Sequence, residues 1–129
     1  MYEAKIVGSS KELSAKEKIV ALDMSLATKL DEAVAAGNVS WEPDYMVTIS
    51  VHNDKARGAD VDPSRMDYEK YVFVAKDGTR YITGSKAFAE SYKRIVEQMA
   101  GSDESFWVVC YRKDSKNYPG KQYLACGIA

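Results

Sequence analysis

The sequence predicts a mainly β protein with one or two helices. From about residue 45 onward, apolar and polar residues alternate with the two-residue period of strands, and this period changes only once to that of a helix. Turn-forming residues separate the runs. A chain of 129 residues, 46% hydrophobic, suffices for one domain with a core and is too short for two ordinary domains. We expect a single domain of residues 1–129, in which residues 1–44 form an N-terminal extension packed on residues 45–129.

Three strands are expected before the helix. Residues 45–52 alternate as a half-buried strand does, and residues 53–65 follow as a loop rich in Asp, Asn, Gly and Pro. A second strand is expected at about 67–75. The sequence Lys-Asp-Gly-Thr at 76–79 is typical of a hairpin turn, so residues 80–83 form the third strand.

One amphipathic helix and two further strands complete the pattern. Ser85 is a candidate N-cap and Gly101 ends the helix. The apolar stripe of this helix has helical spacing and consists of Phe88, Tyr92, Ile95, Val96 and Met99. After it, residues 105–111 and 122–128 are expected to form the last two strands.

The resulting order is strand, strand, strand, helix, strand, strand. This is the order of an OB-like five-stranded Greek-key barrel, and other small α+β folds share it. In such a barrel the ligand-binding loops would be residues 53–65 and 112–121.

Residues 1–44 are less clearly patterned. Residues 2–7 are compatible with a strand, and Ser14 and Glu17 have capping-box spacing for a short helix. Between 19 and 34 the apolar residues fit both helical and strand periods, so the sequence leaves the type of this segment open.

Charge and hydropathy exclude several classes of protein. The net charge of −1 argues against binding a polyanion by bulk charge, so nucleic-acid binding would need a local surface. No apolar run approaches the roughly 20 residues of a membrane-spanning helix, and the residues after Met1 do not resemble a signal peptide. We expect a cytoplasmic protein without membrane contact.

Residues suited to catalysis or metal binding are scarce. Cys110 and Cys126 lack CxxC spacing and a nearby histidine, which indicates small buried hydrophobic residues rather than a zinc site or a disulfide. His52 is the only histidine, and there is no paired-carboxylate spacing, nucleophile elbow or phosphate-binding glycine loop. We therefore expect no enzymatic activity, no cofactor and no metal.

Residues 112–121 concentrate positive charge between the last two strands. Against one anion, Asp114, they contain four cations, which gives a local charge of +3: Arg112, Lys113, Lys116 and Lys121. The position between two strands predicts a basic hairpin tip that contacts phosphate groups.

Strand alternation predicts an aromatic face beside this tip. The residues expected to fill the barrel are Val72, Val74, Ile82, Leu124, Cys126 and Ile128. Alternation then turns six rings the other way, namely Tyr71, Phe73, Tyr81, Trp107, Tyr111 and Tyr123, and Tyr118 lies in the basic segment itself. Rings that stack on bases, together with cations along the backbone, hold single-stranded nucleic acid. The alternative is that several rings are core or cross-strand partners.

Two segments resemble a known family. Residues 71–88, which contain the Asp-Gly-Thr turn and a Thr-Gly-Ser helix start, and residues 115–121, with a Ser-Lys-Asn tip, together resemble small single-stranded-DNA-binding proteins of tailed bacteriophages. The resemblance implies an OB-like fold that coats single-stranded DNA during replication or recombination in the bacterial host cytoplasm, without catalysis. It also implies replication or recombination proteins as partners. Residues 126–129 carry no acidic tail, so recruitment through such a tail is not expected.

A second hypothesis uses the same aromatic face. The chain would then be a protein-interaction module, such as a phage factor that blocks or recruits a host protein. Edge strands and apolar N-terminal residues are compatible with a homodimer.

Overall fold

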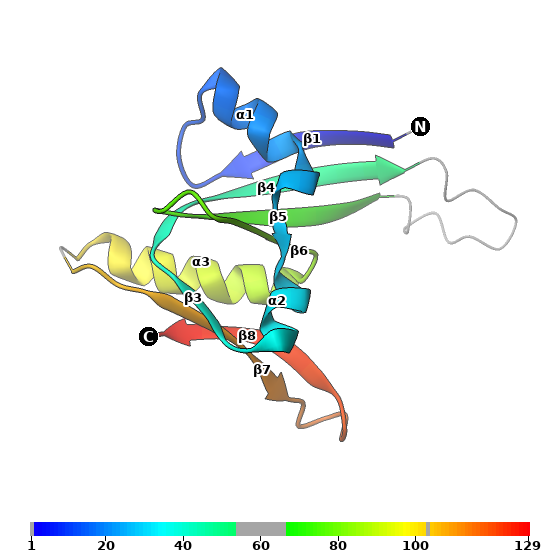
Figure 1. Cartoon of the computed structure of the whole chain (residues 1–129), viewed down its shortest axis with the longest axis vertical. Coiled ribbons are helices and arrows are strands. Elements are labelled where there is room, and N and C mark those ends of the chain that lie inside the picture. The colour runs from blue at the N-terminus through cyan, green and yellow to red at the C-terminus, as the bar shows by residue number, and fades with distance from the viewer. Residues whose placement is uncertain (1, 54–66, 103) are drawn as a thin grey trace, which may run out of the picture.

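The strands of this protein form two separate sheets (Figure 1). The structure is a computed structural model that describes residues 2–53, 67–102 and 104–129. The five-stranded sheet contains, in spatial order, β1 (Tyr2–Ser9), β4 (Pro43–Asn53), β5 (Asp67–Ala75), β6 (Arg80–Thr83) and β2 (Thr28–Lys29). The three-stranded sheet contains β3 (Val39–Trp41), β7 (Val108–Asp114) and β8 (Gln122–Ile128). The prediction of a mainly β protein is confirmed.

The helices are short except for the last one. They are α1 (Ala15–Leu22), the 3-10 helix η1 (Met24–Leu26), α2 (Leu30–Ala36) and α3 (Lys86–Ala100). The Ser85 hydroxyl accepts a hydrogen bond from the Phe88 N–H at 3.2 Å, and Gly101 follows the last residue of α3, so the predicted cap and end are confirmed.

The strands expected at 45–52, 67–75 and 80–83 are confirmed as the antiparallel neighbours β4, β5 and β6. In the turn between β5 and β6, the Ala75 N–H donates to the Thr79 carbonyl at 2.9 Å, and Gly78 has φ of 91°. A positive φ of this size favours glycine, which explains the Asp-Gly signal of the turn.

The last two strands are also confirmed, with shifted bounds. The strand expected at 105–111 begins at Val108 and extends to Asp114, where it still pairs with Gln122 of β8. Consequently Arg112 and Lys113 belong to a strand and not to the hairpin tip.

The N-terminal region contributes strands to both sheets. β1 pairs with β4, and the Ser14–Glu17 capping box begins α1 as its spacing predicted. Residues 19–34 form neither one helix nor one strand, because α1 ends before Asp23. The Asp23 carboxylate accepts a hydrogen bond from the Ser25 hydroxyl, a local side-chain contact that competes with helix continuation.

The predicted closed five-stranded barrel is not observed. Within the described ranges, no strand pairing joins the two sheets. A closed barrel would use one edge each of β4, β6 and β7 for its closure. In this structure those edges are already paired, that of β4 with β1, that of β6 with β2 and that of β7 with β3. All three strands come from residues 1–44, the part of the sequence with the weakest pattern.

Two apolar clusters cover opposite faces of the five-stranded sheet. One cluster lies between this sheet, α3 and the three-stranded sheet, and Phe73, Tyr92 and Val108 are among its members. The other lies on the opposite face under α1 and includes Val47 and Val72. Figure 1 shows α3 between the two sheets and α1 on the far side of β1 and β4. Around Val72 and Phe73 the five-stranded sheet is therefore buried on both faces.

The first cluster is built around aromatic contacts. The Trp41 indole N–H donates to the Tyr92 hydroxyl at 3.0 Å, and the Tyr81 ring stacks on Trp41 with centroids 4.5 Å apart. The Phe73 and Tyr92 rings meet edge to face at 4.5 Å. These contacts fix α3 against both sheets.

Candidate nucleic-acid interface

The three-stranded sheet has one buried face. Residues directly opposite each other in antiparallel strands lie on the same face, and the register pairs Val108 with Trp41 and Cys110 with Cys126. Val108 and Cys110 are both fully buried against α3 and the large sheet. Val108 and Cys110 of β7 therefore point into the protein, whereas Arg112 and Asp114, further along the same face, are exposed.

Odd-numbered residues of β7 and β8 point to the opposite side, which we call the outer face. It consists of Val109, Tyr111 and Lys113 along β7 and Tyr123, Ala125 and Gly127 along β8. Trp107 directly precedes β7, and its carbonyl accepts a hydrogen bond from the Ala129 N–H at 2.9 Å, so it continues the same alternation. Trp107 is 50% exposed and Tyr123 is 47% exposed. Lys113 and Tyr123 are directly opposite each other in the register. The outer face thus combines large exposed rings with a cation.

Tyr111 lies against the backbone of the neighbouring strand. A Cβ built on Gly127 would be 3.9 Å from the Tyr111 hydroxyl, an ordinary contact distance. The Tyr111 ring therefore lies beside the β8 backbone at Gly127. Tyr111 is half-buried as a result, and one side of its ring is supported by protein.

The hairpin tip, residues 115–121, is held by its own hydrogen bonds. The Ser115 N–H donates to the Lys121 carbonyl at 2.9 Å, and the Lys121 N–H donates to the Tyr118 carbonyl at 3.1 Å. Pro119 and Gly120, with Gly120 at φ 82°, occupy the two central positions of this last turn, as in a type II turn. Tyr118, Lys116 and Lys121 are all exposed on the tip.

The structure brings together seven of the predicted site residues. Four lie on the outer face and three on the tip: Trp107, Tyr111, Lys113 and Tyr123, and then Lys116, Tyr118 and Lys121.

Tyr71 and Phe73 are not surface residues, contrary to the prediction. They lie on one face of β5, as alternation predicted, but that face packs against α3, and Phe73 is fully buried. Alternation assigns a residue to a face and does not reveal whether another element covers that face. Burial raises the pKa of Tyr71, with the nearby Glu69 carboxylate as a smaller cause.

Tyr81 and Arg112 are also placed apart from the outer face. Tyr81 is stacked on Trp41, and desolvation raises its pKa. Arg112 and Lys113 are consecutive in β7, so their side chains point to opposite faces of the sheet. The Arg112 guanidinium donates a hydrogen bond to the Asp31 carbonyl at 3.2 Å. Arg112 therefore links β7 to α2 instead of joining the lysines.

The residues predicted to fill one barrel belong to two cores or none. Val72, Val74 and Ile82 lie in the cluster under α1, whereas Leu124 and Cys126 face α3. Ile128 is exposed. The prediction of a single barrel interior was wrong, because the strands belong to two sheets.

The cysteines are free thiols in this fold. Cys110 is buried as predicted and Cys126 is half-buried. Desolvation raises the pKa of both thiols, that of Cys126 to about 11, so neither is ionised at neutral pH. In the described part of the chain, no three His, Cys, Asp or Glu residues are grouped as a metal site would require.

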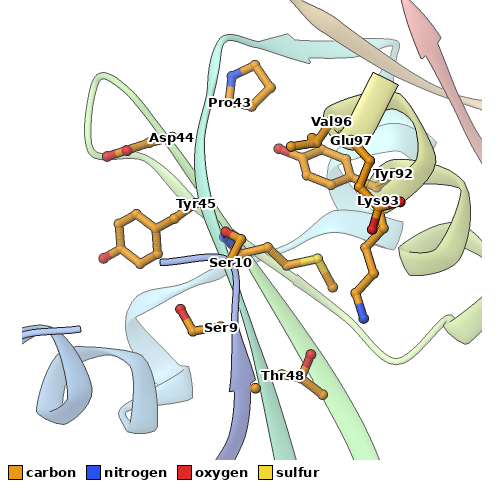
Figure 2. A pocket seen from close by; sticks show the side chains of 12 residues that line it. Ser9, Ser10, Pro43, Asp44, Tyr45, Thr48, Tyr92, Lys93, Val96 and Glu97 are labelled. Carbon is orange, nitrogen blue, oxygen red and sulfur yellow. The ribbon is translucent and has the colours of Figure 1, made fainter. Parts of the chain in front are cut away.

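A pocket of about 340 Å³ lies elsewhere, between β1, β4 and α3 (Figure 2). Apolar lining comes from Met46, Tyr92 and Val96, and the polar lining includes Ser10, Lys93 and Glu97. None of the lining residues belongs to the outer face or the tip. Sequence reasoning did not identify this pocket.

Two irregularities of strand pairing adjoin the pocket. The β1–β4 register shifts between Ile6 and Gly8, and the β4–β5 register shifts between Pro43 and Tyr45. Glycine and proline inside strands often mark such irregularities, so Gly8 and Pro43 were the available sequence signals.

The predicted binding loop at 53–65 falls almost wholly outside the described residues.

Across residues 2–53, 67–102 and 104–129, no helix has the length and apolar character needed to cross a membrane. Comparisons with protein-family models, curated proteins and solved structures found no match to this chain.

Proposed function

We propose that this protein binds single-stranded DNA, with little sequence preference, through the outer face and the hairpin tip. One observation supports this above others: Trp107, Tyr111 and Tyr123 share a solvent-facing surface of one sheet, with Lys113 among them. Single exposed apolar residues are ordinary on a protein surface, whereas a contiguous group of them indicates an interaction site.

The chemistry of this surface suits a single strand. Each ring offers a π-face to an unpaired base, and such stacking contributes roughly 1–3 kcal/mol per base whatever the base is. Lys113 lies within the aromatic surface, and Lys116 and Lys121 extend the positive charge beyond the strand ends. The rings supply most of the affinity, and the lysines attract and align the phosphate backbone.

The biological setting follows from the sequence resemblance. Residues 71–88 and 115–121 resemble single-stranded-DNA-binding proteins of tailed phages, which supports a role in phage DNA replication or recombination in the host cytoplasm. Proteins of those processes are the proposed partners. The binding surface needs no closed barrel, so the proposal does not depend on the OB-like part of the fold prediction.

Tryptophan fluorescence during titration with an oligonucleotide tests the proposal directly. Trp107 is half exposed on the outer face, whereas Trp41 is 2% exposed and bonded to Tyr92. Stacking should quench the Trp107 emission and leave that of Trp41 unchanged. Trp107→Phe should abolish the quench, because only Trp41 then emits. No quench and no binding to oligonucleotides of any composition would refute the proposal.

Salt dependence gives an independent test. Arg112 faces away from the outer face, so the proposed interface contains three lysines. Each phosphate neutralised on a single strand contributes about −0.7 to the slope of log K against log[salt]. We expect a slope of roughly −2. If the outer face instead binds a host protein, as in the second hypothesis, oligonucleotides will not bind and a protein complex will survive high salt.

A further inference from the structure

Within residues 2–53, 67–102 and 104–129, the two sheets end in four edge strands. These are β1 and β2 in the large sheet and β3 and β8 in the small sheet. An edge strand presents unpaired N–H and C=O groups, and proteins ordinarily protect such edges with charged residues, bulges or very short strands.

Three of the four edges carry such protection. β1 contains Glu3 and Lys5 and is interrupted by the bulge between Ile6 and Gly8. β2 has only two residues and β3 only three. None of these edges offers a long regular template for another strand.

β8 lacks all three kinds of protection. It has seven residues, Gln-Tyr-Leu-Ala-Cys-Gly-Ile, without a charge or a proline. Its pairing with β7 continues over all seven positions without a register shift. Ile128 at its end is 56% exposed although it is apolar. β8 is therefore the edge best suited to pair with a further strand.

We infer that the β8 edge binds a second copy of this chain, with the two β8 strands antiparallel about a two-fold axis at Ala125. In this register, the residues of β8 form compatible cross-strand pairs with those of a second, antiparallel β8. Tyr123 of one copy lies opposite Gly127 of the other, and Leu124 lies opposite Cys126. A ring opposite glycine is a favourable cross-strand pair, and no position brings two like charges together.

The dimer enlarges the interface described above. Pairing about this axis makes one continuous sheet in the order β3-β7-β8-β8-β7-β3, with the outer faces of both copies on the same side. Trp107, Tyr111 and Tyr123 of each copy then form one aromatic surface. This second step rests on the proposed function, whereas the dimer itself does not.

Sedimentation velocity of the full chain without DNA tests the dimer. The wild type should shift from monomer to dimer as concentration rises. Ala125→Lys should be monomeric, since it places two like charges directly opposite each other at the axis. Ser40→Lys is the matched control, because it adds the same charge to the outer face of the other edge strand and should leave the dimer intact.

Mixing two charged variants separates the contact from misfolding. Ala125→Lys and Ala125→Glu should each sediment as a monomer, and their equimolar mixture should regain the dimer because opposite charges then meet. A monomeric wild type at every concentration, or a dimer that Ala125→Lys leaves unchanged, would overturn the β8 assignment.

Oligonucleotide titration then tests the shared surface. Because Ala125 lies on the outer face, Ala125→Lys also adds a cation to the proposed interface, so the comparison uses the length dependence of binding and not the affinity itself. The length of oligonucleotide needed for maximal affinity should fall about twofold relative to the wild type. An unchanged length in a variant proven monomeric overturns the shared surface, while loss of binding in the wild type itself would count against the proposed function.

Discussion

The two sheets use aromatic residues in opposite ways. In the five-stranded sheet, Tyr71 and Phe73 alternate with Val72 and Val74, and both sets are buried, because α3 covers one face and α1 the other. In the three-stranded sheet α3 covers one face only, and the rings of the other face meet solvent. The same strand pattern thus produces a core in one sheet and a surface in the other.

This difference assigns different roles to similar rings. Phe73 contacts Phe88 and Tyr92 at ring-centroid distances of 5.2 and 4.5 Å, so it contributes to stability. Trp107 is half exposed and is free to contact a ligand. Substitutions that separate stability from binding test the comparison.

The largest expected effect is on stability, from Phe73→Ala. The side chain is fully buried, and removing it leaves a cavity, so the free energy of unfolding should fall by about 3–5 kcal/mol. Urea denaturation followed by circular dichroism measures this. Tyr123→Ala on the outer face is the control and should change the free energy of unfolding by no more than about 0.5 kcal/mol. Equal losses in both variants would contradict the contrast between the sheets.

The next effect is on DNA affinity, from Trp107→Ala. Loss of one stacked base should weaken binding by about 1–3 kcal/mol, with the free energy of unfolding nearly unchanged. Anisotropy of a labelled oligonucleotide measures the affinity. Tyr68→Ala removes an exposed ring from the other sheet and should bind like the wild type. If Tyr68→Ala lost as much affinity as Trp107→Ala, the outer face would not be the binding surface.

Local patterns predicted the elements well after residue 45. The Asp-Gly turn, the Ser85 cap and the periods of 45–52 and 67–75 are short-range signals, and the structure has the corresponding elements. The outer face could be predicted in part for the same reason, since alternation alone places Trp107, Tyr111 and Tyr123 together.

What could not be predicted depends on long-range contacts. The burial of Tyr71 and Phe73 depends on where α3 packs, and the failure of the barrel to close depends on strands from residues 1–44. No short-range pattern encodes either. The misplacement of Arg112 has a simpler cause: β7 continues three residues past the predicted end, so strand parity separates Arg112 from Lys113.

A smaller effect should distinguish these two neighbouring cations. Lys113→Gln removes a cation from the outer face and should reduce the magnitude of the salt slope by about 0.7. Arg112→Gln removes the same charge from the opposite side, where the guanidinium is bonded to Asp31, and should leave the slope nearly unchanged. Binding isotherms at several salt concentrations measure both slopes. A larger change in slope for Arg112→Gln than for Lys113→Gln would indicate that the DNA contacts the face of β7 opposite the outer face, and it would contradict the proposed interface.

The smallest effect concerns α1, which covers the second face of the large sheet. A 2.8 Å ion pair with Lys11, together with the capping bonds to Ser14, lowers the Glu17 pKa from its ordinary 4.5 to about 2. Because the pKa is lower in the folded state, the pair stabilises the protein above about pH 4.5, and this contribution is lost as pH falls toward 2.

Glu17→Gln should therefore have a lower melting temperature than the wild type at pH 7, and the difference in melting temperature should shrink at pH 2.5. Both side chains are partly exposed, so the difference at pH 7 should be small and decrease further with added salt. A difference in melting temperature that stays constant from pH 7 to 2.5 would show that the ionised carboxylate of Glu17 does not stabilise α1.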